Sequence, residues 1–258
     1  MPPDHRNQMT NTATINYIHK QSTKCLPPRL VPAEDLDHHP LTRIKNKRNE
    51  NKLYIATLNT RTLRTPESLS DLEEALKDLK WDILEISEMR RTGEYIEEHQ
   101  DFILFNKGVI EEQGGVGFIV KKYLKEHIIE FIGINDRTAI LNIILPSFKK
   151  TWTIIQVFAP TEQADEFKHE SFYNDLSQAI ISNYSKNIII LMGVFNAQVG
   201  IKQCKEDVLG HFGYGKRSKN GQRLVEFLLE HNLTLLNSIL RKTTSGPGSL
   251  QAEIIETK

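Results

Sequence analysis

One apolar run constrains the fold of this chain more than any other feature. Residues 188–192 read Ile-Ile-Ile-Leu-Met, with polar Lys186 and Asn187 before the run and Gly193 after it. A short run rich in β-branched side chains predicts a strand that is buried on both faces. Polar side chains just after such a strand often bind ligands, because the sheet holds the backbone rigid while the loop stays open. Asn196 is therefore a candidate site residue, and a turn-forming asparagine is the alternative.

The composition is that of a globular protein with a substantial core, since 39% of the 258 residues are hydrophobic and 26% are charged. The 33 basic and 33 acidic residues cancel, so a nucleic-acid contact needs a local basic patch. The two cysteines, Cys25 and Cys204, lie far apart and favour a reducing compartment over a disulfide scaffold. Without a signal-peptide pattern or a membrane-spanning apolar run, we expect an intracellular protein, nuclear or cytoplasmic, with no membrane partner.

The chain divides into three parts. Residues 1–51 are polar and proline-containing, and we expect them to form a disordered extension. A basic run at residues 43–48 suits a nuclear-import signal, an arm that contacts phosphates, or a solvated linker. Residues 52–240 carry the patterns of an ordered domain, and residues 241–258 are expected to form an irregular tail.

Strand patterns outnumber helix patterns within residues 52–240. Apolar and alternating runs predict further strands at residues 53–58, 82–87, 102–105, 116–120, 128–134, 138–145, 151–158 and 233–236. Apolar residues at three- and four-residue steps predict helices at residues 69–79, 164–183 and 222–231. The predicted buried side of the second helix consists of Phe167, Phe172, Leu176, Ile180 and Ile181. Several strands follow one another directly while helices join others, so we expect an α+β fold of two packed sheets covered by helices.

Three predicted strand ends carry polar side chains that can converge on one site. Asn59 ends the first predicted strand, Glu88 ends the second, and Asn196 follows residues 188–192. Each residue also has a simpler interpretation, as a turn asparagine or as an exposed acid. Their shared position at strand ends favours a common site.

Six segments in this order resemble the motifs of the endonuclease/exonuclease/phosphatase superfamily, from about Leu53 to Ser238. They read LNTRTL, ISEMRRTG, GGVGFIV, IQVFAPT, MGVFNAQVG and GHFGYGKRSKNGQRLVEFLLEHNLTLLNS. The branch they resemble best is that of non-LTR retrotransposon endonucleases, including craniofacial development protein 2-like sequences. The resemblance implies a DNase I-like α/β/β/α sandwich of four layers.

The resemblance also implies a reaction, the hydrolysis of a phosphodiester, usually in DNA, with the help of a divalent metal such as Mg²⁺. Glu88 matches the glutamate that holds the metal, and carboxylate oxygens suit this ion. Asn59 matches the asparagine that orients the metal shell and the scissile phosphate. Asn196 matches the asparagine that hydrogen-bonds the reacting phosphate, and Arg137 occupies a place where relatives often carry an arginine facing the substrate.

The sequence departs from the family pattern at three places. Val194 stands where the family has the aspartate of Gly-Asp-x-Asn, and an isopropyl group can neither deprotonate water nor bind metal. Phe158 stands where relatives carry a tyrosine or histidine, so a contact to the developing phosphate charge is lost. After Ser238 the family's final strands, with their aspartate and histidine, do not appear, and neither His211 nor His231 is a substitute. The expected sandwich is therefore C-terminally truncated.

Two functional hypotheses follow. The chain is either a metal-dependent nuclease or a non-catalytic remnant that binds nucleic acid or protein, and the substitutions favour impaired catalysis. Weak DNA binding would use Arg137 together with the basic loop residues Lys216, Arg217 and Lys219, with Arg223 nearby. An uncovered sheet edge would allow self-association.

Overall fold

The computed structural model describes residues 53–77, 79–110, 113–145, 149–183 and 188–239, together with the backbone of Ile18–Lys20. The predicted irregular tail at residues 241–258 and the basic run at residues 43–48 lie outside the described residues. Within these ranges, no helix has the length and apolar character that crossing a membrane requires.

The first sheet contains five strands in the order β2-β3-β6-β5-β4. Their bounds are β2 (Ile55–Asn59), β3 (Ile83–Ser87), β4 (Gly93–Glu98), β5 (Phe102–Gly108) and β6 (Val116–Lys121). Strands β2 and β3 are parallel, and the remaining pairs are antiparallel. Helix α1 (Pro66–Leu76) covers the outer face and begins at Thr65, whose side chain forms a reciprocal capping box with Ser68.

The second sheet contains six strands in the order β11-β1-β10-β9-β8-β7. Their bounds are β1 (Ile18–Lys20), β7 (Ile128–Gly133), β8 (Thr138–Ile144), β9 (Thr151–Phe158), β10 (Ile188–Val194) and β11 (Leu233–Leu235). Only β9 and β10 are parallel. Helices α2 (Glu166–Asn183) and α3 (Lys219–Glu230) cover the outer face, while the short 3₁₀ helices η1 (Lys122–His127) and η2 (Leu236–Ser238) adjoin the sheets.

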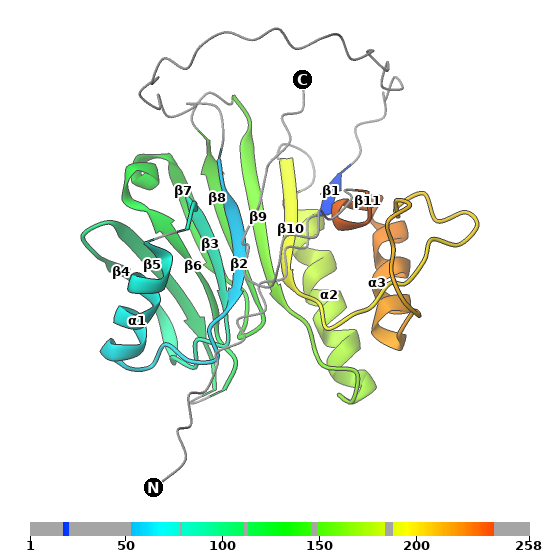
Figure 1. Ribbon diagram of the computed structural model, residues 1–258, viewed down its shortest axis with the longest axis horizontal. Coiled ribbons are helices and arrows are strands. Elements are labelled where there is room, and N and C mark those ends of the chain that lie inside the picture. The colour runs from blue at the N-terminus through cyan, green and yellow to red at the C-terminus, as the bar shows by residue number, and fades with distance from the viewer. Residues whose placement is uncertain are drawn as a thin grey trace, which may run out of the picture.

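The two sheets lie face to face, with α1 outside the first and α2 and α3 outside the second (Figure 1). Alternate residues of each strand point to opposite faces, which explains the three separate hydrophobic clusters. For example, Ile83 packs between the sheets, whereas its neighbour Leu84 packs against α1. The structure thus confirms the predicted α+β fold of two sheets between helical layers.

Within residues 1–51, which the sequence predicts to be a disordered extension, Ile18–Lys20 form the short strand β1. This strand lies between β10 and β11 and runs antiparallel to both. Its backbone finds pairing partners on both sides, which a composition dominated by polar residues and prolines does not reveal. The rest of residues 1–51 lies outside the described part of the chain.

Candidate active site

The predicted pair at the ends of β2 and β3 is present. Asn59 pairs with Ser87 in the parallel register, so the residues that follow each strand are neighbours. The Asn59 side-chain nitrogen donates a hydrogen bond of 2.6 Å to Glu88 Oε1, and Asn59 Oδ1 accepts one of 3.0 Å from the Arg61 amide. Both ends of the Asn59 amide are therefore fixed, and its nitrogen orients the Glu88 carboxylate.

Glu88 stands at a sharp change of backbone direction. It has a φ of +57°, a conformation that a non-glycine residue adopts at a cost, and a quarter of its side chain is exposed. The Arg90 guanidinium lies 3.6 Å from Glu88 Oε2. Glu88 is thus held between a donor amide and a cation while one part of its carboxylate faces solvent.

A glycine turn links this half of the site to the second sheet. Gly114 and Gly115, with φ of +55° and +84°, accept hydrogen bonds from the backbone N–H groups of Arg90 and Met89. The Gly115 N–H in turn donates to the carbonyl of Asp136, the residue before Arg137. The predicted glycine motif therefore connects the segment after Glu88 to the loop that carries Arg137.

The other half of the site lies at the ends of the parallel strands β9 and β10. Val194 pairs with Phe158 in the register, and both side chains are partly buried. Asn196 follows with a φ of +47°, and its side-chain nitrogen donates to the Ala159 carbonyl at 2.8 Å. Strand β2, which ends at Asn59, and strand β10, which ends at Val194, both run to the lower edge of the sheets in Figure 1, so the two halves of the site belong to the same edge.

Arg137 also belongs to this edge. Its guanidinium donates to the Phe158 carbonyl at 3.1 Å and lies 5.5 Å from the centre of the Phe158 ring. The phenyl ring at position 158 therefore binds a cation by its face, although it offers no hydroxyl or imidazole.

Two residues that the sequence does not single out join these elements. The Asn220 side chain, at the start of α3, donates at 3.0 Å to the carbonyls of both Pro160 and Asn196. The Gln156 side chain of β9 donates across the sheet interface to the Ile86 carbonyl of β3. Neither residue forms part of a periodic pattern, so nothing in the sequence alone indicates these roles.

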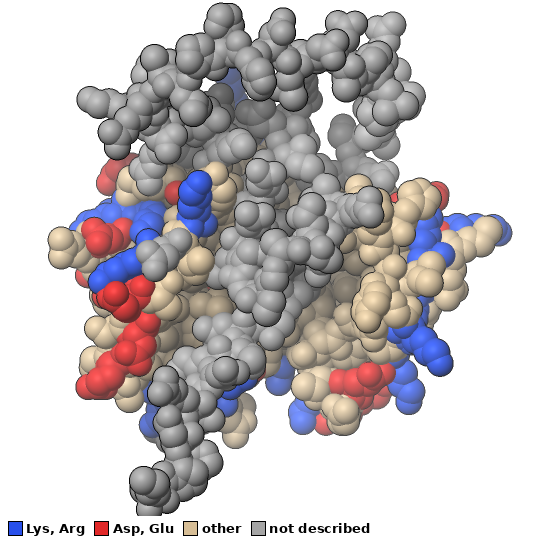
Figure 2. Space-filling model, viewed as in Figure 1, with Lys and Arg blue, Asp and Glu red and all other residues tan. Residues whose placement is uncertain are grey.

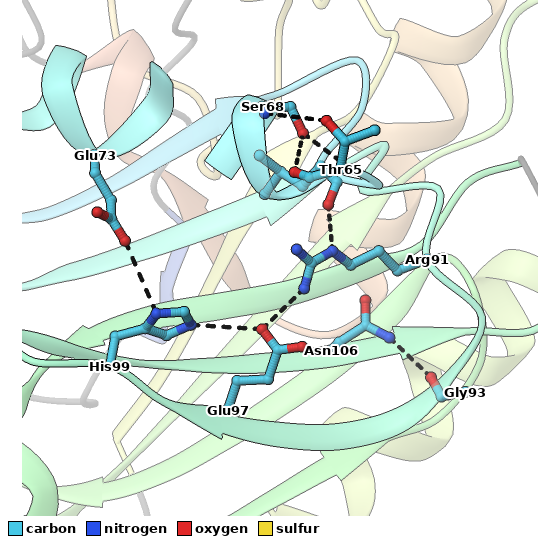
Figure 3. Close-up of polar contacts among 9 residues, drawn as sticks. Thr65, Ser68, Glu73, Arg91, Gly93, Glu97, His99 and Asn106 are labelled. Carbon is cyan, nitrogen blue, oxygen red and sulfur yellow. Dashed lines mark hydrogen bonds and ion pairs between the residues drawn. The ribbon is translucent and has the colours of Figure 1, made fainter. Parts of the chain in front are cut away.

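A polar network also supports the loop after β2 (Figure 3). The Arg91 guanidinium donates to the Leu63 carbonyl and, at 3.0 Å, to Glu97 of β4. His99 lies between Glu97 and Glu73 of α1, at 3.5 and 3.9 Å, and stacks on Phe102. These contacts fix the chain on either side of Asn59 and Glu88 without touching either residue.

The predicted basic loop contains one arginine that is paired inside the protein and two lysines that are exposed. Arg217 differs from the expected free cation: its side chain is 9% exposed, and its guanidinium pairs with Glu206 through contacts of 2.5 and 2.7 Å while Nε donates to the Val199 carbonyl. The Arg217 hydrogen bonds lower the pKa of Glu206, and Glu206 raises the pKa of Arg217. Arg217 therefore holds the loop together and does not offer a free cation.

The other three basic residues named for DNA binding in this region differ in their exposure. Lys216 and Lys219 are exposed, whereas Arg223 pairs with Glu166 of α2. Lys and Arg side chains appear along the side of the molecule formed by α3 and the loop before it, interrupted by acidic groups (Figure 2). The basic patch is consequently smaller than its sequence indicates.

The two histidines of this region lie outside the site arrangement. His211 is exposed, and His231 accepts or donates a 2.9 Å hydrogen bond with Ser177 while its ring packs on Phe227. Burial lowers the pKa of His231.

Glu88 offers a carboxylate, the kind of ligand that a divalent metal such as Mg²⁺ prefers. Among the described residues, no cluster of three or more histidine, cysteine, aspartate or glutamate side chains could hold an ion. Mg²⁺ commonly binds through one or two carboxylates and keeps several waters. Glu88 suits this mode of binding, in which one carboxylate and several waters surround the ion. The described residues do not form a closed cage of protein ligands.

The arrangement defines a class of protein. A two-sheet α+β sandwich with an asparagine–glutamate pair at one strand edge, and an asparagine after a buried strand opposite it, is what the motifs predict for the endonuclease/exonuclease/phosphatase superfamily.

Comparison with known proteins gives the particular relatives. No family model matches the chain. It is 29% identical over 189 residues to craniofacial development protein 2 of Bos taurus, and 30% identical over 189 residues to that of Tragulus javanicus. The match covers 73% of this chain and 31% and 32% of the two relatives, so the chain spans about a third of their length. Together with the ordered motifs and the fold, this similarity supports the predicted resemblance to the endonuclease/exonuclease/phosphatase superfamily.

Solved structures are similar at a lower level. The endonuclease domain of TRAS1, a telomere-specific non-LTR retrotransposon, matches with a TM-score of 0.47 at 12% identity, covering 70% of this chain and 72% of that one. The AP endonuclease LMAP of Leishmania major matches with a TM-score of 0.47 at 11% identity, covering 75% and 72%. A humanised D. rerio TDP2 matches with a TM-score of 0.39 at 15% identity, covering 56% and 62%. Because these TM-scores lie below 0.5, we draw nothing further from them.

Proposed function

We propose that this chain is a retrotransposon-derived endonuclease/exonuclease/phosphatase-like domain that contacts the phosphodiester backbone of DNA and is catalytically impaired. The observation that carries this proposal is an asymmetry between the two halves of the site. The Asn59–Glu88 pair is intact at 2.6 Å, whereas the opposite half presents Val194 and Phe158.

The intact half suits metal and phosphate binding. Glu88 would hold Mg²⁺, which supplies charge neutralisation at a phosphate when it is bound. Asn59 keeps the carboxylate in one orientation, because its amide is anchored at both the nitrogen and the oxygen. Asn196 uses one of its two amide hydrogens on the Ala159 carbonyl and keeps the second for a phosphate oxygen.

The opposite half lacks the group that would take a proton from water. Val194 has no ionisable atom, and its neighbour in the register, Phe158, has no hydrogen-bonding side-chain atom. Loss of one general base commonly costs a factor of about 10²–10⁴ in rate. Binding without efficient hydrolysis is therefore the expected behaviour, and a non-catalytic binding module is the second candidate that this half of the site favours.

The test compares binding and cleavage in one sample. Fluorescence anisotropy with a labelled DNA duplex at low salt should show weak binding, and gel analysis of the same DNA after incubation with Mg²⁺ should show no cleavage. The double variant Lys216→Ala/Lys219→Ala should reduce binding, with Lys168→Ala of α2 as an exposed control. Efficient Mg²⁺-dependent cleavage that Glu88→Gln abolishes would contradict the impaired reading, and no binding even at low salt would contradict the DNA contact.

A further inference from the structure

A group of polar side chains lies inside the sandwich, next to the candidate active site. Along β3, Leu84 and Ile86 pack toward α1, so Glu85 and Ser87 between and beyond them face the second sheet. Thr57 of β2 pairs with Glu85 in the register and faces the same way. Gln156 of β9 reaches this layer from the other sheet, because its side-chain nitrogen donates to the Ile86 carbonyl.

These side chains are buried, and each has at least one polar atom without a hydrogen-bond partner among the described residues. Glu85 and Gln156 are 0% exposed, and Thr57 and Ser87 are 1% exposed. Thr57 Oγ1, both carboxylate oxygens of Glu85, Ser87 Oγ and Gln156 Oε1 have no hydrogen-bond partner among the described residues. Buried polar atoms are nearly always hydrogen-bonded, to protein or to ordered water, so this cluster calls for an explanation.

Among the described strands around Glu85, no inward-facing side chain supplies a compensating charge. The neighbouring inward-facing residues described on β2, β6, β9 and β10 are Thr57, Phe118, Gln156 and Met192, and none of them ionises. The titratable groups on β3 and its flanks, Asp82 and Glu88, are themselves acidic. An ionised carboxylate without a partner in such a place is very costly, and burial raises the pKa of Glu85 well above its ordinary value.

We propose that Thr57, Glu85, Ser87 and Gln156 form an internal site that holds one proton, on the Glu85 carboxyl, and bridging water between the two sheets. The neutral acid and the two hydroxyls supply hydrogens, while the Gln156 and Glu85 oxygens accept them. Water joins them, since each internal water makes two to four hydrogen bonds and these side chains make none with one another.

The site couples protonation to the sheet edge that carries the candidate active site. Ser87 immediately precedes Glu88, and Gln156 stands two residues before Phe158. Ionisation of Glu85 would therefore weaken the sheet interface directly beneath both halves of that edge. This inference does not depend on any nuclease activity of the chain.

The pH dependence has a definite sign. The Glu85 carboxyl keeps its proton in the folded state, whereas in the unfolded chain it loses the proton near pH 4.3, which is about the ordinary glutamate pKa. Below that pH both states are protonated, so the folded chain has its full stability. This stability falls as the pH rises toward the folded pKa, by up to about tenfold in the folding equilibrium constant for each pH unit.

The experiment measures denaturant unfolding of the full chain from pH 5 to pH 9. Glu85→Gln keeps the shape and removes the titration, so the wild-type chain should lose stability with rising pH relative to this variant. Glu130→Gln, an exposed glutamate of β7, should follow the wild-type chain. Parallel curves for the wild-type chain and Glu85→Gln would overturn the proposal.

Two further measurements apply even if Glu85→Gln fails to fold. The infrared spectrum of the wild-type chain at pH 7 should contain the carbonyl band of a protonated carboxylic acid. Absence of this band would refute the proposal that Glu85 is protonated. Nuclear magnetic resonance spectra should show long-lived water contacts to the amides of Thr57 and Ser87. Absence of these contacts would refute the proposal that water bridges the site.

Discussion

Asn59 and Glu88 lie 29 positions apart in the sequence and are joined by a 2.6 Å hydrogen bond from the asparagine amide to the glutamate carboxylate. The parallel pairing of β2 and β3 produces this contact, because it brings the ends of both strands to one edge. The bond points the Glu88 carboxylate in one direction and leaves Arg90 as its nearby cation. The pair is the part of the candidate site that matches the residues to which the family resemblance assigns metal binding.

We expect Mg²⁺ to bind weakly and through Glu88. One carboxylate, already shared with Asn59 and Arg90, leaves most of the metal shell to water. Titration calorimetry should show low affinity for the wild-type chain and no binding for Glu88→Ala, with Glu126→Ala as an exposed control. Tight, stoichiometric binding that Glu88→Ala removes would show that further ligands complete the site.

Arg217→Ala should destabilise the folded chain more than Lys216→Ala. The first change leaves Glu206 and the Val199 carbonyl without their partner in a largely buried place, which costs about 3 kcal/mol. The second removes an exposed side chain and should change the unfolding free energy by less than about 0.5 kcal/mol. Chemical denaturation measures both, and equal stabilities would mean that the pair holds nothing together.

The same pair should affect stability in acid. The pKa of Glu206 is lowered mainly by its hydrogen bond with Arg217, so its contribution is present above the unfolded glutamate pKa and is lost as the pH falls through the lower folded pKa. The unfolding free energies of the wild-type chain and Glu206→Gln should therefore converge as the pH falls from 6 toward 2. A difference that persists unchanged at pH 2 would contradict this assignment.

DNA binding should be strongly dependent on salt. The exposed lysines offer few phosphate contacts on a chain of zero net charge, so binding should fade between low and physiological salt. Repeating the anisotropy titration over this range, with and without the two lysine substitutions, measures the number of contacts. Binding that ignores salt would indicate a mode other than phosphate contact.

Self-association is expected through β2. Among the described strands, β2 pairs only with β3 and forms one edge of its sheet, although most of its residues are buried. Such an edge invites pairing with another chain. Sedimentation velocity of the full chain, which keeps β1 in place between β10 and β11, should show association that increases with concentration. A monomeric, cooperatively melting chain would argue that the edge is covered.

The sequence predicts the elements whose burial follows a simple period. The strand at residues 188–192 is found within β10, and the two predicted strand ends that carry Asn59 and Glu88 are neighbours in the fold. Strand β4 is absent from the prediction, because its residues Gly93–Glu98 are largely exposed and polar. Phe167 and Ile181 were expected in the core, yet they are 76% and 59% exposed, since α2 instead buries the face that includes His169 and Ala179.

Long-range polar pairing is what sequence patterns fail to predict. Lys216 and Arg217 are neighbouring cations in a loop, and only the folded chain distinguishes the exposed lysine from the arginine held by Glu206. Glu85 likewise lies in a run that predicts a buried strand. A single acidic residue in such a run does not change the predicted pattern, so the sequence does not indicate its unpaired, buried position. Such positions depend on which strands stack against each other.

The most direct test of impaired catalysis is nicking of supercoiled plasmid DNA by the full chain in the presence of Mg²⁺. We predict that the wild-type chain gives no nicking above a heat-treated sample, and that Val194→Asp alone restores none, because Phe158 still lacks a polar group. Nicking by the wild-type chain that disappears with a chelator and in Glu88→Gln would contradict the central claim.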